Sequence, residues 1–183
     1  MPSVNTMESA FATARKEWDS VAMSNTSCDE LNREDLAQCA AIIDETELFR
    51  DYGTTGQAIT KLLEKALSDP SSDLLALRTG TGLAGFAWVL RNGAFGRSAY
   101  LRLIAVSSVS RGHGYGSRLL AGIEAKHLLP HGLFLLTTET NTGARRFYET
   151  SGYGLLGIIP GYVKPGLNEC IYYKAYKAQA LTR

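Results

Sequence analysis

The stretch SRGHGYGSRLL, residues 110–120, places three glycines at alternate positions behind Arg111. Glycine lacks a Cβ atom, so the backbone at 112, 114 and 116 can turn tightly and direct several N–H groups at one point. An apolar run, LRLIAV, precedes this loop, and SRLLAGIEAK follows it with apolar residues at helical spacing. The positive end of a helix dipole favours anions, and Arg111 adds a full charge. These residues predict a pyrophosphate site, with a glycine-rich connection that binds nothing as the alternative.

A second glycine cluster, TGTGLAG at 79–85, matches the dinucleotide-binding pattern G-x-G-x-x-G through Gly80, Gly82 and Gly85. That pattern binds a pyrophosphate only where it follows a strand and opens a helix. Here the run FAWVLRN follows, and its Phe, Trp and Val residues favour a strand. No acidic residue stands about twenty positions further on to bind a ribose hydroxyl. The sequence therefore predicts a hairpin turn at this cluster.

These motifs lie among alternating helical and strand-like segments. Apolar residues at helical spacing predict helices at 33–46, at 55–67, from the glycine loop to about His127, and from an Asn141 cap to Gly152. Short apolar runs predict strands at 73–79, 82–90, 98–106, 133–138, 153–159 and 168–175. The segment LFRDYGTTG is expected to break the helical pattern, and 7–22 could be a further amphipathic helix. This order indicates an α/β (α+β) domain with a mixed, mostly antiparallel sheet, flanked by about four helices.

The composition fits one soluble domain. The chain has 183 residues, of which 45% are hydrophobic and 20% charged, and we expect one domain over 26–183 behind an extension at 1–25. A net charge of +1 gives no overall attraction to nucleic acid or to a membrane. Three widely separated cysteines, Cys28, Cys39 and Cys170, favour reduced thiols over disulfides or a metal site. No run is long enough to span a bilayer and no secretory signal stands at the N-terminus, so we expect a cytoplasmic protein.

The glycine loop and a later segment resemble a known family. An R-x-x-G-x-G loop between a strand and a helix resembles the acetyl-CoA loop of the GNAT superfamily of N-acetyltransferases. At the expected distance comes the run LFLLTT and then Asn141, Ala144, Tyr148 and a Gly152-aromatic pair, similar in order to the family's second motif region. The resemblance covers about residues 73–175 and leaves the first 25 residues outside it.

The resemblance implies a splayed strand pair in the sheet, with the pantetheine arm of acetyl-CoA between 103–106 and 133–138. Backbone groups of Ile104, Ala105 and Val106 would pair with the arm. The Val106 N–H would be an oxyanion donor, useful because charge builds on the thioester oxygen during the reaction. Asn141 would bond the arm or the departing thiol. The pyrophosphate would be held by the loop residues Arg111, Gly112, His113, Gly114, Tyr115, Gly116 and Ser117.

By the same resemblance, Tyr148 would be the general acid that protonates the leaving thiol. A thiol has a pKa of about 8.5 and a phenol has one of about 10, so complete proton transfer from the phenol to the sulfur before the C–S bond breaks is unfavourable. A hydrogen bond to sulfur that tightens as the C–S bond breaks is the more plausible form of this step. The alternative is an aromatic packing residue one helical turn after Ala144.

The general base is less evident. An alkylamine has a pKa of about 10.4, so it must lose a proton before it can attack. Where some family members place a strand glutamate, this chain has Tyr100, with Arg102 nearby and no carboxylate. Glu139, at the end of the next strand, is a candidate base acting through a water molecule, and a chain of waters ending on a backbone carbonyl is the alternative.

The acceptor side would be formed by LFRDYGTTG, with Phe49 and Tyr52, by Tyr100, and by PGYVKPGLNE, with Tyr162 and Glu169. Aromatic residues with one or two charges would suit a small amine or a peptide end. The alternative is that these aromatic residues only close a small core.

Together, these features predict an enzyme that moves an acetyl group from acetyl-CoA to a primary amine of a small molecule or a protein. Attack would be direct, in a ternary complex, because no cysteine lies near the two motifs to form a covalent intermediate. No metal is expected, since the cysteines lack metal-ligand spacing. One alternative is an acyl-CoA-binding sensor without catalysis. Another is toxin-like acetylation of aminoacyl-tRNA, which the balanced charge disfavours. A homodimer is compatible with a chain of this size.

Overall fold

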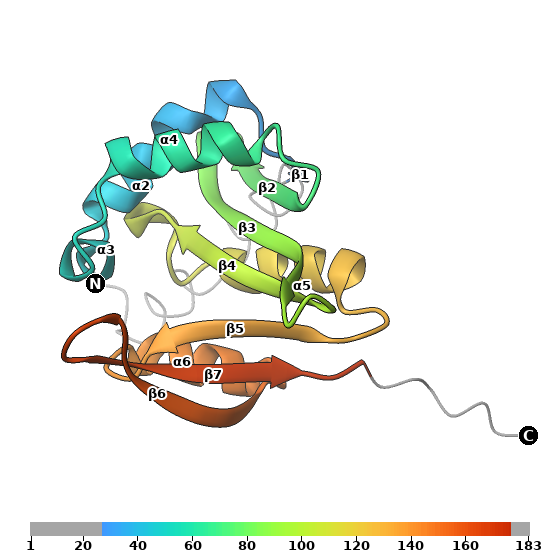
Figure 1. Ribbon diagram of the computed structural model, residues 1–183. Coiled ribbons are helices and arrows are strands. Elements are labelled where there is room, and N and C mark those ends of the chain that lie inside the picture. The colour runs from blue at the N-terminus through green and yellow to red at the C-terminus, as the bar shows by residue number, and fades with distance from the viewer. Residues whose placement is uncertain (1–26, 177–183) are drawn as a thin grey trace, which may run out of the picture.

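A computed structural model describes residues 27–176, which form a seven-stranded sheet covered by helices on both faces (Figure 1). The strands are β1 (Ser27–Glu30), β2 (Ser72–Thr79), β3 (Gly82–Ala94), β4 (Ser98–Val106), β5 (Leu133–Thr138), β6 (Gly154–Lys164) and β7 (Leu167–Lys174). The α-helices are α2 (Leu36–Glu45), α3 (Glu47–Asp51), α4 (Gly56–Ala66), α5 (Tyr115–His127) and α6 (Thr142–Thr150). The helix predicted at 7–22 lies outside the described residues.

The sheet has the order β1-β2-β3-β4-β5-β7-β6. Each neighbouring pair is antiparallel except β4 and β5, which are parallel and joined through α5. A parallel pair needs a crossover of this kind, whereas antiparallel strands can be joined by a short turn. The predicted mixed, mostly antiparallel sheet is therefore confirmed.

Two elements depart from the sequence-based expectation. β1 was not predicted, because its residues SCDE are all exposed and show no apolar alternation; only pairing with β2 makes this segment a strand. The segment after residue 46 was expected to break the helices, but it forms the short helix α3. The helices are interrupted at Thr46, whose backbone is extended with φ −93° and ψ 113°, and again over residues 52–55, in the second half of the predicted break.

Two apolar clusters fill the space between the sheet and its helices. One holds α2 and α4 against the first half of the sheet, through residues such as Ile43, Leu63 and Phe86. The other holds α5 and α6 against the opposite face, through residues such as Leu119 and Tyr148. Figure 1 shows the same division, with α2 and α4 across one face and α5 and α6 behind the sheet. Among residues 27–176, no helix is both long and apolar enough to cross a membrane.

β4 and β5 separate along their length, which confirms the predicted splay. Their pairing runs only from Ala99 and Leu133 to Leu101 and Leu135. Beyond that point β4 continues beside β3 to Val106, while β5 continues beside β7. Figure 1 shows the two strands diverging toward the side on which α3 lies. The sheet therefore opens between its two halves at the end of β4.

The 79–85 glycine cluster forms the predicted hairpin turn between β2 and β3, in which Thr79 pairs with Gly82. Gly82 has φ +124°, which residues with a side chain rarely adopt. The Gln38 side chain closes the turn by accepting a hydrogen bond from the Leu83 N–H at 2.8 Å. A β-strand rather than a helix follows the glycines, so this cluster lacks the helix N-terminus that a dinucleotide site requires.

Candidate functional site

A cavity of about 520 Å³ lies where the sheet opens, a size in the range typical of ligand sites. Its walls come from the Thr46–Asp51 segment, the end of β4, the glycine loop and the start of α6. The site residues predicted from sequence that it brings together are Phe49, Ile104, Ala105, Val106, Arg111 and Asn141. Segments far apart in the chain thus meet at one hollow at the end of β4.

The end of β4 directs backbone groups toward the splay. The Ser107 N–H donates to the Ala84 carbonyl at 2.9 Å, and Val106 lies opposite Gly85. In an antiparallel ladder, hydrogen-bonded pairs alternate with pairs whose N–H and C=O groups point away from the partner strand. Because Ser107 belongs to a bonded pair, the groups of Val106, and of Ile104 two residues earlier, point away from β3. They are therefore available to an extended ligand beside β4.

The glycine loop turns into the first residues of α5. Gly112 and Gly114 have φ values of +78° and +75°, and no atom lies within 4 Å of the Cβ position of either residue. The first N–H groups of a helix have no partner within the helix, so the start of α5 provides donors next to this open space. Glu45 fixes the loop, because its carboxylate accepts from the Ser108 N–H at 2.6 Å and from the Ser108 hydroxyl at 2.9 Å. Arg111 donates to the Thr46 hydroxyl at 3.3 Å.

The other loop side chains lie in different environments. His113 is exposed, and its Nδ1 is 2.9 Å from the Arg111 carbonyl oxygen. The Tyr115 ring is buried in the core beneath α5, so only its backbone can face a ligand at the loop. Gly116 and Ser117 lie in the first turn of α5, which begins two residues earlier than the run SRLL. The loop therefore offers mainly backbone donors, with Arg111 as the charged side chain.

Asn141 stands at the N-terminus of α6 and lines the cavity. Its Oδ1 accepts a hydrogen bond from the Ala144 N–H at 3.1 Å and caps the helix. Because an asparagine amide has one oxygen and one NH₂ group, this bond leaves the NH₂ group as the donor for a ligand.

Tyr148 lies in the core between α6 and the sheet, 5% exposed and outside the residues that line the cavity. Its ring packs against those of Phe147, Tyr153 and Tyr172, with centroids 5.1, 5.8 and 6.2 Å away. Burial raises the pKa of Tyr148, and the Tyr100 phenol adds to the rise. Tyr148 is therefore protonated and a weak acid, which fits a hydrogen-bond donor better than a full proton donor.

Glu139, the base predicted from the sequence, is hydrogen bonded at the end of β5. Its Oε2 accepts from the Asn168 side chain at 2.9 Å, and its backbone N–H donates to the Asn168 carbonyl at 2.8 Å. Thr138 pairs directly with Glu169 across β5 and β7, so those two side chains share one face of the sheet. Since successive side chains alternate between faces, Glu139 points to the opposite face.

Glu169, which the sequence placed on the acceptor side without a catalytic role, is a buried carboxylate. It is 2% exposed, and the Tyr52 hydroxyl donates to its Oε1 at 2.5 Å. Burial raises the pKa of the Glu169 carboxyl, and the bond from Tyr52 opposes that rise. Burial, and then the bond to Glu169, raise the pKa of Tyr52 to about 12. The signal in the sequence was a single carboxylate inside the core strand LNECIYYK, but only strand pairing shows which face it occupies.

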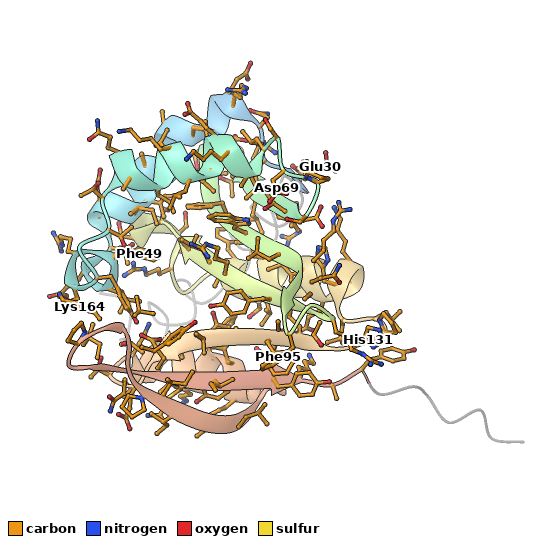
Figure 2. All side chains as sticks on the ribbon, in the orientation of Figure 1. Glu30, Phe49, Asp69, Phe95, His131 and Lys164 are labelled. Atoms are coloured by element: carbon orange, nitrogen blue, oxygen red, sulfur yellow. The ribbon has the colours of Figure 1, made fainter. Side chains whose placement is uncertain are left out.

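Two further predicted acceptor residues, Tyr100 and Tyr162, lie on β4 and β6. Tyr100 is half-buried on β4; burial raises its pKa, and Arg102, Tyr162 and Glu169 are close enough to influence it. The Tyr162 side chain is 63% exposed on β6. Figure 2 shows Phe49 on α3 and Lys164 at the end of β6 on the same side of the molecule. The Lys164 Nζ donates to the Asp51 carbonyl at 2.5 Å and so ties the β6–β7 hairpin to α3.

No metal-binding group of three or more His, Cys, Asp or Glu side chains occurs among residues 27–176. The three cysteines are free thiols. Cys170 lies in the same core cluster as Tyr148, and burial raises the pKa of its thiol. A buried thiol with a raised pKa is a poor nucleophile, because the thiolate is the reactive form.

The model of the acetyltransferase (GNAT) family matches residues 32–153, and the chain belongs to this family. No curated protein matches the sequence significantly.

Solved structures share the fold at low sequence identity. A protein described as a GNAT-family acetyltransferase, from Desulfovibrio desulfuricans, is 19% identical with a TM-score of 0.70, over 82% of this chain and 98% of that one. A GNAT-family acetyltransferase from Bacillus cereus is 21% identical with a TM-score of 0.67, over 84% and 99%. The spermidine N-acetyltransferase from Vibrio cholerae, in complex with CoA and spermine, is 16% identical with a TM-score of 0.67, over 82% and 95%.

Proposed function

We propose that the protein transfers the acetyl group of acetyl-CoA to a primary amine by direct attack in a ternary complex. The observation that carries this proposal is the cavity at the splay between β4 and β5. There the backbone of Ile104 to Val106 meets Arg111 of the glycine loop and Asn141 of α6. The membership of the family and the similarity to an amine acetyltransferase that binds CoA and spermine agree with it.

The binding of acetyl-CoA follows from the backbone geometry. The pyrophosphate would lie over Gly112 and Gly114, where open space and the N–H groups at the start of α5 coincide. The pantetheine arm would pair with the groups of Ile104 and Val106 that face away from β3. The NH₂ group of Asn141 would bond the arm from the other side of the gap.

The reaction would proceed by addition and elimination at the thioester carbonyl. The amine nitrogen forms a C–N bond, and the carbonyl oxygen gains charge that the Val106 N–H stabilises. The C–S bond then breaks, and the thiolate takes the proton of the Tyr148 phenol as it leaves. The extra proton on the new amide nitrogen restores the phenol, so atoms and charge balance. Cys170 is buried as a thiol, which argues against an acetyl-cysteine intermediate.

Calorimetry and a thiol-release assay test the proposal. Acetyl-CoA should bind, and an amine panel that includes spermidine, spermine and peptides with a free N-terminus should release CoA thiol. Absence of heat at about millimolar acetyl-CoA, a weak affinity on the usual scale, would contradict the proposed site. Binding without thiol release would instead support an acyl-CoA sensor. Acetylation restricted to charged tRNA would support the third function, and dimerisation and a cytoplasmic location stay predictions.

Tyr148→Phe tests the proposed acid. Its turnover should fall by about a hundredfold, the lower end for general acid catalysis, with little change in acetyl-CoA affinity. Tyr153→Phe is the matched control, because Tyr153 is 3% exposed and belongs to the same group of rings. If both variants lose equal activity, or if Tyr148→Phe mainly weakens binding, Tyr148 is a packing residue.

A further inference from the structure

The proposed function leaves the proton of the acceptor amine without a destination. A free alkylamine has a pKa of about 10.4, so at neutral pH the acceptor arrives as an ammonium ion without a lone pair to attack with. The base must lie on the face of the sheet from which the acceptor enters. Glu139 lies on the other face, and its carboxylate already accepts a hydrogen bond from Asn168.

Glu169 lies on the face toward α3. Its neighbours along β7, Cys170 and Tyr172, alternate with it: both belong to the core cluster beneath α5 and α6. Side chains alternate along a strand, and Cys170 points into that cluster, so Glu169 points the other way. There Tyr52, which directly follows α3, donates to its carboxylate at 2.5 Å. Neither Tyr52 nor Glu169 lines the cavity itself, but Asp51, the residue directly before Tyr52, does, so the pair adjoins the wall that α3 forms.

The carboxylate has no cationic partner in the protein. Within residues 27–176, no lysine, arginine or histidine nitrogen forms an ion pair with Glu169. A buried carboxylate is costly unless it is paired, and a phenol supplies only one neutral hydrogen bond. The hydroxyl of Thr138, which is 2% exposed and pairs with Glu169 across the strands, lies close enough to Tyr52 to lower the pKa of its phenol, against the effects of burial and of Glu169. The site therefore holds a buried carboxylate with only a neutral donor beside it, which suits an ammonium group.

Tyr100 on β4 is close enough to both members of the pair to interact with them electrostatically. Arg102 on β4 and Tyr162 on β6 lie near Tyr100. Tyr100 also contributes to the raised pKa of Tyr148, so it lies near both the proposed acid and the carboxylate. Arg102 is held over the Trp88 ring, with its guanidinium carbon 4.7 Å from the ring centroid. Among these side chains, Glu169 therefore carries the carboxylate that could accept a proton.

We propose that Glu169 is the catalytic base for the acceptor amine and that Tyr52 positions it; this inference rests on the proposed function. An N–H bond of the ammonium breaks and an O–H bond forms on the carboxylate, which leaves a neutral amine to attack the thioester. The proton on Glu169 passes to water after the product leaves. This proton transfer is unfavourable in free energy, since the carboxyl is a stronger acid than the ammonium group. Burial raises the pKa of Glu169 and so reduces the difference in pKa between the two groups. The acceptors are thus amines that are cationic in solution.

Glu169→Gln tests the base, with Glu149→Gln as the matched control, because the Tyr172 hydroxyl likewise donates to the Glu149 carboxylate. Thiol release should be followed from about pH 6 to about pH 10, which spans the approach to the amine's ordinary pKa. At neutral pH we expect kcat to fall by about a hundredfold in Glu169→Gln. The deficit should shrink as the pH rises and with a weakly basic amine, because the free amine then needs no base. Acetyl-CoA affinity by calorimetry should not change, and Glu149→Gln should keep the activity of the unaltered protein.

Thermal denaturation checks that the variant folds. Because burial raises the pKa of Glu169 above its unfolded value, its ionisation destabilises the folded state as the pH rises through that pKa. The neutral amide removes this effect, so the Tm of Glu169→Gln at neutral pH should not fall below that of the unaltered protein. Should Glu169→Gln fold poorly, Tyr52→Phe keeps the carboxylate and should give a smaller deficit with the same pH dependence.

The outcomes separate this inference from the proposed function. A deficit that is equal at all pH values, or a rise in KM with kcat unchanged, would show that Glu169 only binds the cationic acceptor. Either result would overturn this inference and leave the proposed function standing. Full activity in Glu169→Gln would do the same. If the unaltered protein binds acetyl-CoA but releases no thiol with any amine, the proposed function is wrong and the inference with it.

Discussion

Gly82 and Gly85 in the first glycine cluster differ from Gly112 and Gly114 in the second by what surrounds their missing side chains. A Cβ atom at Gly85 would lie 2.6 Å from the Ala105 carbonyl oxygen, and one at Gly82 would lie 2.9 Å from the Gln38 side chain. At Gly112 and Gly114, no atom lies within 4 Å of the same position. The first pair lets parts of the protein approach one another, while the second pair leaves space that the protein does not fill.

This difference explains why the pattern alone is a poor guide to function. The first cluster matches G-x-G-x-x-G, but its glycines are needed for a turn and for the close packing of β3 on β4 and α5. The second cluster opens a helix, and its Gly112 and Gly114 adopt positive φ values beside the first N–H groups of that helix and open space. The empty volume around a glycine, rather than its place in a pattern, therefore separates packing from ligand binding.

The largest expected effect on stability is that of Gly85→Ala. The new methyl group would meet a backbone oxygen at 2.6 Å and the Leu119 side chain at 3.1 Å, and the backbone cannot move aside cheaply. We expect a loss of about 3 kcal/mol in the free energy of unfolding, the upper part of the range for overpacking. For a chain of this size that lowers the Tm by about 6–12 °C in thermal denaturation.

Gly157→Ala on β6 is the control for this substitution, since no atom lies within 4 Å of its Cβ position. Both substitutions put the same methyl group on a strand, so the difference in Tm measures the packing alone. If Gly85→Ala is no less stable than Gly157→Ala, the first cluster is not a packing device and the comparison fails.

Gly114→Ala should affect ligand binding more than stability. Its φ of +75° costs a residue with a Cβ atom about 1–2 kcal/mol, but the protein offers no steric conflict. The methyl group would instead enter the space where we place the pyrophosphate. We therefore expect acetyl-CoA affinity, measured by calorimetry, to fall by at least about tenfold, which is about 1.4 kcal/mol.

Gly96→Ala is the matched control for Gly114→Ala. Gly96 has φ +66° and an equally open Cβ position, but it lies in the hairpin between β3 and β4. The two variants should lose similar stability and differ in acetyl-CoA affinity. Equal affinities would show that the open space at Gly114 is not where the ligand binds.

Much of the fold was predictable because its signals are local. Apolar alternation and turn residues indicated six of the strands, and Asn141 indicated the start of α6 through its capping side chain. β1 was not predictable in this way, since four exposed polar residues become a strand only by pairing with β2. Likewise, α3 has only five residues, which are too few for an apolar period to be evident.

The candidate site was predictable where its chemistry depends on backbone and sequence order, as in the glycine loop and at Asn141. It was not predictable where residues distant in the chain must meet. Tyr52 and Glu169 are 117 positions apart, and their hydrogen bond depends on α3 and on the register between β5 and β7. The face on which Glu139 lies depends on the same register, which no local pattern encodes.

The smallest expected effect is that of Gly116→Ala, the third glycine of the same loop. Gly116 lies within α5, and an added Cβ would contact Phe147 at 3.7 Å and Val106 at 3.9 Å, which are ordinary packing distances. Alanine favours a helix over glycine by up to about 1 kcal/mol, so stability should stay equal or rise slightly. The methyl group points at the protein rather than at the open space, so acetyl-CoA affinity should change by less than about twofold, within about 0.4 kcal/mol. A large loss of affinity in calorimetry would place the ligand between α5 and Val106, and would show that this glycine too is kept for the ligand.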